Sequence, residues 1–312
     1  MLSRVADSLY WMSRYLERAE HTARLLDVNL HQMLDQTPES ANQRWERLLA
    51  SLRIPSPKEG TNDVYSITRL LIFDAANSAS IVACILAARE NARQVREQLS
   101  SEMWEQLNRL FLQVKRTSMD ESWRREPHEF FKSVKEGVHL LQGITDTTMS
   151  HDEGWQFIQI GRFLERANST ATLLDNHFNT IGQLDYLSWI GLLKSCTAFE
   201  AYCKVYTADI RPEYVAEFLL LDVTFPHSIH FSVDIMQNEL KAISRRTNAR
   251  DAFRAERLAG RLQAALDYGQ VDEIMASNLH LFLENIRQQC AQIHTAIHEI
   301  FIAYPADSAL DS

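Results

Sequence analysis

The sequence is short of the residues that make turns. It has nine glycines and seven prolines among 312 residues, less than half of the roughly 12% that these two residues contribute together to an average protein. A sandwich or barrel of many short strands needs such residues at its connections. The shortage therefore excludes an all-β fold and favours long helices joined by few turns.

The sequence also lacks a basic surplus and a long apolar run. Its 32 Lys and Arg face 41 Asp and Glu, a net charge of -9, and no basic patch is segregated, so we expect no nucleic-acid partner. The longest weakly polar run, residues 75–88, is well short of the roughly 20 residues of a membrane helix. Arg4 and Asp7 interrupt the apolar stretch that a signal peptide needs. We expect a soluble, cytoplasmic protein without a membrane partner.

Cysteine is scarce as well. The four cysteines are Cys84, Cys196, Cys203 and Cys290. None has C-x-x-C spacing, which favours buried thiols in a reducing cytosol over a disulfide framework. The sequence has no Gly-rich phosphate loop, no Gly-x-Ser-x-Gly and no H-E-x-x-H. We therefore expect no cofactor. Whether the chain is an enzyme stays open, and these absences favour a protein without autonomous activity.

An internal repeat is present. Residues 13–27 match residues 161–175 at an offset of 148, with ten of fifteen positions identical. The same offset pairs Asp74 with Asp222, and an offset of 144 pairs Trp45 with Trp189. Because the order of the matches is preserved, the sequence predicts two related halves, residues 1–148 and 149–312, packed as one unit.

Both halves have helical periodicity. Apolar residues recur every three or four positions over residues 2–33 and 157–181, which predicts a long helix at the start of each half. Further helical patterns include residues 63–98, 183–208 and 270–303. Prolines mark the breaks, because proline cannot donate the intrahelical bond. The predicted fold class is all-α, with two tandem pseudo-symmetric helical bundles from an internal duplication.

Each of the two long helices carries an Arg-x-x-Glu-Arg motif pointing away from its apolar seam. The motif candidates are Arg14, Glu17, Arg18, Arg162, Glu165 and Arg166. The outward positions that differ between the halves are Glu20, His21 and Arg24 against Asn168, Ser169 and Thr172. The motif is thus retained in both halves while its outward neighbours are not.

Two interpretations of the motif stay open. In the structural one, Arg14 and Glu17 form an ion pair within one helix, and Arg18 binds carbonyls or carboxylates of neighbouring helices. In the functional one, the two motifs face a shared cleft. Four arginines would hold a phosphate or carboxylate there, and a glutamate would orient an amine or move a proton.

Other candidates lie outside the motif. The secondary candidates are Asp74, Asp222 and His227. The last precedes Ser228 at a predicted helix start, where capping and packing explain it as well as chemistry does. Cys290, His294 and His298 recur every four residues on one helical face, a spacing that metal ligands can use. A metal site also needs ligands and a second shell elsewhere, so we predict no metal there.

Three segments carry a resemblance to a known family. They are LSRVADSLYWMSRYLERAEHTARLL (residues 2–26), GRFLERA (161–167) and FLLLDVTFPHSI (218–229). They resemble the bacterial Alpha-E family, an all-helical group named for its Glu-Arg motif. The resemblance covers nearly the whole chain and transfers Glu17, Arg18, Glu165 and Arg166 as motif positions.

The resemblance also implies a setting. Alpha-E members are typically encoded beside circularly permuted ATP-grasp ligases and transglutaminase-like peptidases, which implies these proteins as partners. We therefore expect an accessory or binding component of an ATP-grasp-linked system for peptide synthesis or modification. The first alternative is an enzyme of the same pathway that uses a charged cleft between the repeats. The second is a purely structural helical scaffold whose Glu-Arg motifs are internal ion pairs.

Overall fold

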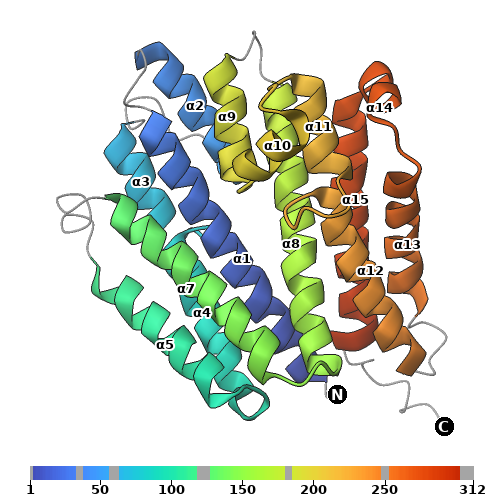
Figure 1. The fold of residues 1–312 in the computed structure, drawn as a ribbon. Helices are drawn as coiled ribbons and strands as arrows, with labels where there is room; N and C mark the ends of the chain where they lie inside the picture. The colour runs from blue at the N-terminus through green and yellow to red at the C-terminus, as the bar shows by residue number, and fades with distance from the viewer. Residues whose placement is uncertain are drawn as a thin grey trace, which may run out of the picture.

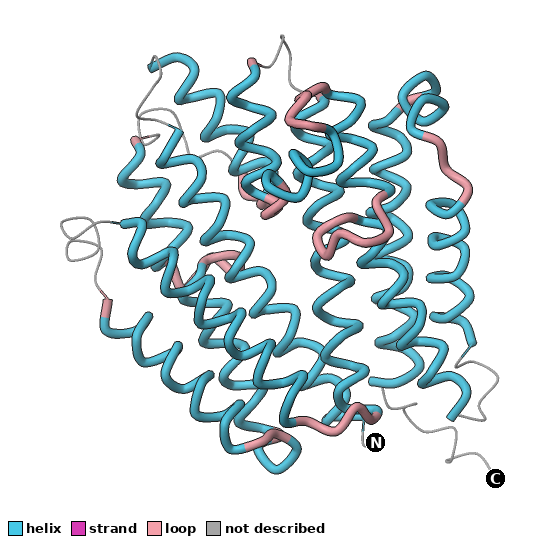
Figure 2. The backbone as a smooth tube through the Cα atoms, viewed as in Figure 1, coloured by secondary structure: helices cyan, strands magenta, loops and turns pink. Residues whose placement is uncertain are grey.

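The protein is all-α, as the sequence predicts. The computed structural model describes residues 3–32, 38–55, 63–117, 127–179, 185–246 and 253–302. Within these ranges it contains fourteen α-helices and no strand (Figure 2). A 3-10 turn, η2 (Arg96–Gln98), and a π-helical turn, η4 (His298–Ile302), extend two of the helices.

The helices divide between the two predicted halves. Those of the first are α1 (Ser3–Gln32), α2 (Pro38–Ser51), α3 (Val64–Phe73), α4 (Ile81–Gln94), α5 (Ser101–Arg116) and α7 (Pro127–Thr148). Those of the second are α8 (Glu153–Phe178), α9 (Tyr186–Ser195), α10 (Phe199–Tyr206), α11 (Pro212–Leu221), α12 (Ile229–Arg246), α13 (Phe253–Asp267), α14 (Val271–Ser277) and α15 (Leu279–Ile297). The predicted boundary after residue 148 lies between α7 and α8, and the division into two repeats stays a prediction.

The two long helices α1 and α8 lie side by side at the centre of the molecule (Figure 1). Helices α4 and α7 pack against α1, whereas α12 and α15 pack against α8. Outside them, α5 contacts α7 and α13 contacts α15. Each central helix buries side chains on more than one face, including Leu9 and Leu26 of α1 and Phe157 and Leu174 of α8. A single hydrophobic core therefore runs through both halves.

The central helices approach most closely at Gly161 of α8. A Cβ atom built there would lie 2.3 Å from Oγ of Ser13 and 2.4 Å from the carbonyl oxygen of Tyr10. Contacts this short to backbone cannot be relieved by rotating a side chain. The repeat places a serine in α1 where α8 has Gly161, and only the glycine lets the two backbones meet.

Positions related by the repeat share local geometry. Arg53 follows α2 and Thr197 follows α9, 144 residues later, and both have a φ of 56°, in the left-handed region that few non-glycine residues adopt. Thr22 of α1 and Thr170 of α8 each donate to a carbonyl oxygen in the loop before α4 or α12, both at 3.3 Å. The two halves thus end and connect corresponding helices in the same way.

Three helices that periodicity predicts as continuous are each interrupted. The pattern over 63–98 breaks between α3 and α4, where Ser80 caps α4 by accepting from the backbone N–H of Ala83 at 3.2 Å. The pattern over 183–208 breaks at the left-handed Thr197. The pattern over 270–303 breaks at Asn278, which caps α15. Both helices of each pair bury apolar residues in the same core, so their spacing does not reveal the break.

Two further features bear on the chemistry of the protein. No helix in the described part of the chain is both long and apolar enough to cross a membrane. Cys84, Cys196 and Cys290 are buried free thiols, and Cys203 is partly exposed. Burial raises the pKa of each buried thiol to about 12, so these three remain protonated near neutral pH.

The close contact at Gly161 gives a first prediction. Gly161→Ala should lower the free energy of unfolding by about 1–3 kcal/mol, because the added methyl group forces the α1 and α8 backbones apart. Gly143→Ala is the control, since nothing lies within 4 Å of a Cβ built at this position of α7. That substitution should stabilise by about 0.5–1 kcal/mol. Urea unfolding measures both, and equal effects at the two sites would refute the close approach.

Candidate functional site

The two Arg-x-x-Glu-Arg motifs pair with each other across the interface of α1 and α8. Glu165 accepts hydrogen bonds from Nε of Arg14 at 2.7 Å and from Nε of Arg18 at 2.8 Å. Reciprocally, Glu17 accepts from Nε and Nη2 of Arg166 at 2.5 and 2.9 Å. Each carboxylate lies on one helix and its guanidinium partners lie on the other. Arg14 therefore pairs with Glu165, where the structural interpretation of the sequence expected Glu17.

Both carboxylates are removed from solvent. Glu17 is 3% exposed and Glu165 is 4% exposed. Burial by itself would raise the pKa of Glu165, but Arg14 and then Arg18 outweigh burial and hold this pKa at about 2. Glu165 therefore stays ionised throughout the physiological range. A general base needs a pKa near the working pH, so the paired Glu165 is suited to holding the helices together and poorly suited to moving protons.

The two ends of this network differ in tightness. Nε of Arg162 lies 3.9 Å from Oε2 of Glu17 and has no hydrogen-bond partner among the described residues. Burial and the adjacent Arg166 lower the pKa of Arg162 to about 10. The corresponding Arg14 is bonded to Glu165 at 2.7 Å. The network is therefore better satisfied at the Glu165 end.

An open cleft lies against the Glu165 end. Its volume is about 740 Å³. Helix α1 contributes Arg14, Arg18 and His21 to the lining, and α8 contributes Glu165 and the small polar residues at positions 168, 169 and 172. The rest of the lining comes from residues 51–55 at the end of α2, from Leu70 of α3, and from Asp74 and residues 76–79 of the α3–α4 connection. The cleft thus collects four segments that are far apart in the sequence.

The lining of the cleft is charged and only partly neutralised. Arg53 donates to Oδ1 of Asn168 at 3.0 Å and to Oγ1 of Thr172 at 3.3 Å, both neutral acceptors. Arg18 reaches Glu165 through Nε alone, and its side chain remains 23% exposed. Asp74 contributes a carboxylate from the α3–α4 connection. The cleft therefore offers guanidinium donors near one separate carboxylate.

The repeat relates this cleft to a second place in the interface of α1 and α8, at the Glu17 end, and side chains fill that place. The small polar side chains 168, 169 and 172 of the open cleft correspond to Glu20, His21 and Arg24, and Ala79 corresponds to His227. Glu20 and Arg24 form a buried ion pair, and the space that remains beside Glu20, His21 and His227 is about 10 Å³. A space of this size holds about one water molecule. The outward positions that differ between the halves are thus the positions that open one cleft and fill the other.

The secondary candidates occupy different positions relative to the cleft. Asp74 ends α3 and lines the open cleft, where its Oδ1 accepts from the N–H of Ala76 at 2.9 Å. Asp222 ends α11 and accepts from the N–H groups of Thr224 and Phe225, both at 2.8 Å. His227 lines the filled position, where burial and then Arg166 lower its pKa well below the usual value. The structure brings Asp74 to the motif cleft and leaves Asp222 in a local turn.

Cys290, His294 and His298 do not form a metal-ligand group among the residues that the structure describes. Nδ1 of His294 lies 2.9 Å from the hydroxyl of Tyr10 and 3.2 Å from Nη1 of Arg14. Burial and then Arg14 lower the pKa of His294 to about 4. The ring is therefore neutral near pH 7 and accepts from Arg14. His294 supports the arginine network, a role that sequence reasoning missed.

Sequence reasoning also missed a second set of paired charges. Asp27 near the end of α1 binds His128, at 2.6 Å, and Lys135 of α7. Asp175 of α8 binds His280 and Arg287 of α15, at 2.6 and 3.3 Å, and these two residues follow His128 and Lys135 by 152 positions. The signal in the sequence that could have found these pairs was the offset of 152, a third offset between the two halves.

Two groups of three side chains of the kinds that bind metals lie close together in the described ranges. They are Asp27, His31 and His128, and His230, Asp234 and Asp267. In the group of Asp27, His31 and His128, the ammonium group of Lys135 already neutralises the carboxylate of Asp27.

Both cross-paired motifs and the cleft fall within the range of one family model. Residues 1–302 match Alpha-E, described as a predicted alpha-helical domain with a conserved ER motif. The chain belongs to the Alpha-E family. Both Glu-Arg sequences of this Alpha-E chain, residues 17–18 and 165–166, therefore lie inside the matched domain.

Proteins similar to this Alpha-E chain occur in mycobacteria. An uncharacterized protein of Mycobacterium bovis is 24% identical over 319 residues, which cover 95% of this chain and 36% of that protein. Uncharacterized proteins of two strains of Mycobacterium tuberculosis are 24% and 23% identical over the same shares. The chain thus spans about a third of the length of these curated relatives. No solved structure matches the chain.

The depressed pKa of Glu165 gives the second prediction. Its pKa falls from a usual 4.5 to about 2, so the stabilisation is fully present above pH 4.5 and is lost as the pH falls towards 2. Glu165→Gln should therefore lower the free energy of unfolding by about 3 kcal/mol at pH 7, and this difference from the unmodified protein should shrink between pH 4.5 and 2.

The control for this prediction is Glu105→Gln, at an exposed position of α5, which should change stability by less than about 0.5 kcal/mol. Urea unfolding at a series of pH values measures both variants. A loss at Glu165 that is small at pH 7, or that does not depend on acid pH, would contradict the pairing.

Proposed function

We propose that this Alpha-E chain is a binding component of an ATP-grasp-linked system that makes or modifies peptides, and that the open cleft holds the peptide. The observation that carries the proposal is the difference between two related positions. One is an open, charged cleft of about 740 Å³, and the other is filled to about 10 Å³. If the motifs served packing alone, an open charged cleft on one side would cost buried contacts and bring no benefit in return.

The chemistry of the lining suits a peptide. Guanidinium groups bind carboxylates with paired hydrogen bonds. Arg53 donates to the neutral acceptors Asn168 and Thr172, and Arg18, which binds Glu165 through Nε, keeps 23% of its side chain exposed. Asp74 supplies a carboxylate for an amine or a backbone N–H group. The volume lies within the roughly 300–1,000 Å³ of common ligand sites. A short peptide with both a carboxylate and an amine meets these requirements.

The motif glutamates favour binding over catalysis. Both oxygens of Glu165 and both oxygens of Glu17 are engaged by arginines of the opposite helix, and the pKa of Glu165 is held at about 2. The enzyme alternative then needs another proton carrier. His21 is the candidate, because it lines the cleft, its Nε2 has no hydrogen-bond partner among the described residues, and burial lowers its pKa.

We also infer that the two halves arose by internal duplication followed by unequal change. The shared left-handed residues after α2 and α9, the matching threonine bonds and the reciprocal Glu-Arg pairs support this history. After duplication, the substitutions around Glu20 would have filled one cleft while the other stayed open. In this proposal each chain therefore keeps one binding site.

The partners come from the family setting. Alpha-E resemblance implies a circularly permuted ATP-grasp ligase and a transglutaminase-like peptidase beside this chain. In the curated relatives the matched region is 36% of the length, so in those proteins it is joined to further polypeptide. This supports a role in which the Alpha-E chain works beside another protein. In this proposal the ligase supplies activation by ATP, and the Alpha-E chain presents the peptide.

The test copies the filled position into the open cleft. The triple variant Asn168→Glu, Ser169→His, Thr172→Arg introduces the side chains of Glu20, His21 and Arg24, which include an ion pair four residues apart. In a reconstituted mixture with the neighbouring ligase, product detected by mass spectrometry should fall at least about tenfold, equivalent to about 1.4 kcal/mol of lost binding. Thermal unfolding should show that the triple variant still folds.

Two controls separate the alternatives. Thr295→Arg adds a charge to an exposed position of α15 and should leave product formation unchanged. His21→Asn tests the enzyme alternative, which predicts loss of product with peptide binding retained. Full product formation by the folded triple variant would contradict the cleft as the binding site, and a ligase that works equally well without the Alpha-E chain would contradict the accessory role.

A further inference from the structure

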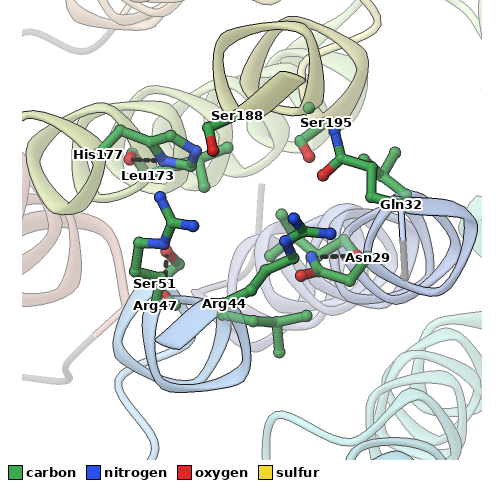
Figure 3. Close-up of a pocket in the computed structure, with 13 residues that line it drawn as sticks. Asn29, Gln32, Arg44, Arg47, Ser51, Leu173, His177, Ser188 and Ser195 are labelled. Carbon is green, nitrogen blue, oxygen red and sulfur yellow. Dashed lines mark hydrogen bonds between the residues drawn. The ribbon is translucent and has the colours of Figure 1, made fainter. Parts of the chain in front are cut away.

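A small pocket between α1, α2, α8 and α9 is surrounded by polar side chains (Figure 3). Its volume is about 30 Å³, enough for roughly two water molecules and too little for an organic ligand. A metal ion needs no such cavity, because its ligand atoms lie only about 2.0–2.2 Å from it. Side chains of the kinds that bind metals meet elsewhere, where α12 packs against α13.

His230 of α12 has one ring nitrogen fixed by the backbone. The residue is 4% exposed, and its Nδ1 lies 3.1 Å from the carbonyl oxygen of Leu221 at the end of α11. Because a carbonyl oxygen only accepts, Nδ1 carries a proton and donates to it. In the neutral ring Nε2 is then an acceptor. Proteins commonly orient a metal-binding histidine through such a bond from its other ring nitrogen.

Two carboxylates face this acceptor. Nε2 of His230 lies 2.8 Å from Oδ1 of Asp267 and 3.6 Å from Oδ1 of Asp234, and the three atoms all lie within 4.8 Å of one another. A nitrogen lone pair and a carboxylate oxygen repel each other at such distances unless positive charge lies between them. That charge is either a second proton on the ring or a metal ion.

A second ring proton leaves the group unbalanced. It supplies one positive charge against two carboxylates, and within the described residues neither Asp234 nor Asp267 has a Lys or Arg partner. Asp267 is also the last residue of α13, where the helix dipole places partial negative charge. The group around Asp27 differs, because Lys135 binds its carboxylate. A divalent cation balances both carboxylates at α12 and α13.

We propose that His230, Asp234 and Asp267 bind one divalent transition-metal ion of the zinc class. An imidazole with two carboxylates is a mixed nitrogen and oxygen set, which suits zinc better than magnesium or calcium, the ions that prefer oxygen alone. Ligand atoms around a tetrahedral zinc lie roughly 3.3 Å apart, close to the 2.8 and 3.6 Å between these side chains. Gln263 orients Asp234, because its Nε2 donates to Oδ1 of Asp234 at 2.9 Å. Water fills the fourth position.

The ion joins three helices. His230 is the second residue of α12, Asp267 ends α13, and the ring of His230 holds the last residue of α11 through its bond to Leu221. The side chains of Asp234 and Asp267 are 28% and 44% exposed, which gives the ion a path from solvent and lets the carboxylates turn to meet it. None of the three ligands lines the motif cleft. The metal therefore stabilises the second half without entering the proposed peptide site.

The test uses the full chain, freed of metal by a chelator. In a non-coordinating buffer at pH 7.5, calorimetric titration with zinc chloride should give one tight site per chain. Zinc should also raise Tm with saturation, by at least about 3 °C, whereas magnesium chloride at the same concentrations should not. A Tm that zinc does not raise, or that magnesium raises equally, would overturn the proposal.

Two variants locate the site. Asp234→Asn and Asp267→Asn keep the size of the side chain and remove its charge, so each should fold and should bind zinc at least about tenfold more weakly. His128→Gln is the matched control, because it removes a side chain from the group around Asp27 and should leave the zinc affinity unchanged. Affinity undiminished in both aspartate variants, or lost in His128→Gln instead, would contradict the site. These measurements are independent of product formation by the reconstituted system.

Discussion

Two buried carboxylates fix the arrangement of α1 and α8. Glu17 and Glu165 each lie on one helix and bind arginines of the other. A buried charge that loses its partner costs about 3–5 kcal/mol, so the helices are stable only in the register where both glutamates meet their arginines. That register brings Gly161 against the backbone at Tyr10, and the flanking helices pack around the pair so formed.

The same constraint explains why the cleft sits where it does. The ion pairs occupy the middle of the interface, and the residues beside them decide whether the adjoining space is open or filled. On one side this neighbour is Asn168, bonded to Arg53. At the related position it is Glu20, paired with Arg24 and accompanied by His227. A common framework of charges thus lies beside one open cleft, and the small side chains at positions 168, 169 and 172 leave it open.

Much of this fold follows from the sequence, and the site follows only in part. Periodicity is enough to predict all-α structure and the two long helices, because apolar spacing reports which residues are buried. It does not report the partner of a buried charge, so the bond from Arg14 to Glu165 could not be distinguished from one to Glu17. The breaks at Ser80 and Asn278 are also hidden, since helices on both sides face one core.

The cleft illustrates a different limit. Its donors Arg14 and Arg18 stand in the motif and were predicted, whereas the donor Arg53 and His294, which accepts from Arg14, come from segments without a Glu-Arg motif. Their contribution depends on how α2 and α15 pack against the central pair. Comparison of the two halves did point to positions 168, 169 and 172 as changed, but only the structure relates that change to an open space.

The most direct measurement of the central claim is a pair of double-mutant cycles on the free energy of unfolding. One cycle joins Arg14→Met with Glu165→Gln, across the two helices, and the other joins Arg14→Met with Glu17→Gln, within one helix. Crossed pairing predicts a coupling of about 2 kcal/mol or more for the first and less than about 0.5 kcal/mol for the second. Strong coupling of Arg14 to Glu17 with none to Glu165 would contradict the account.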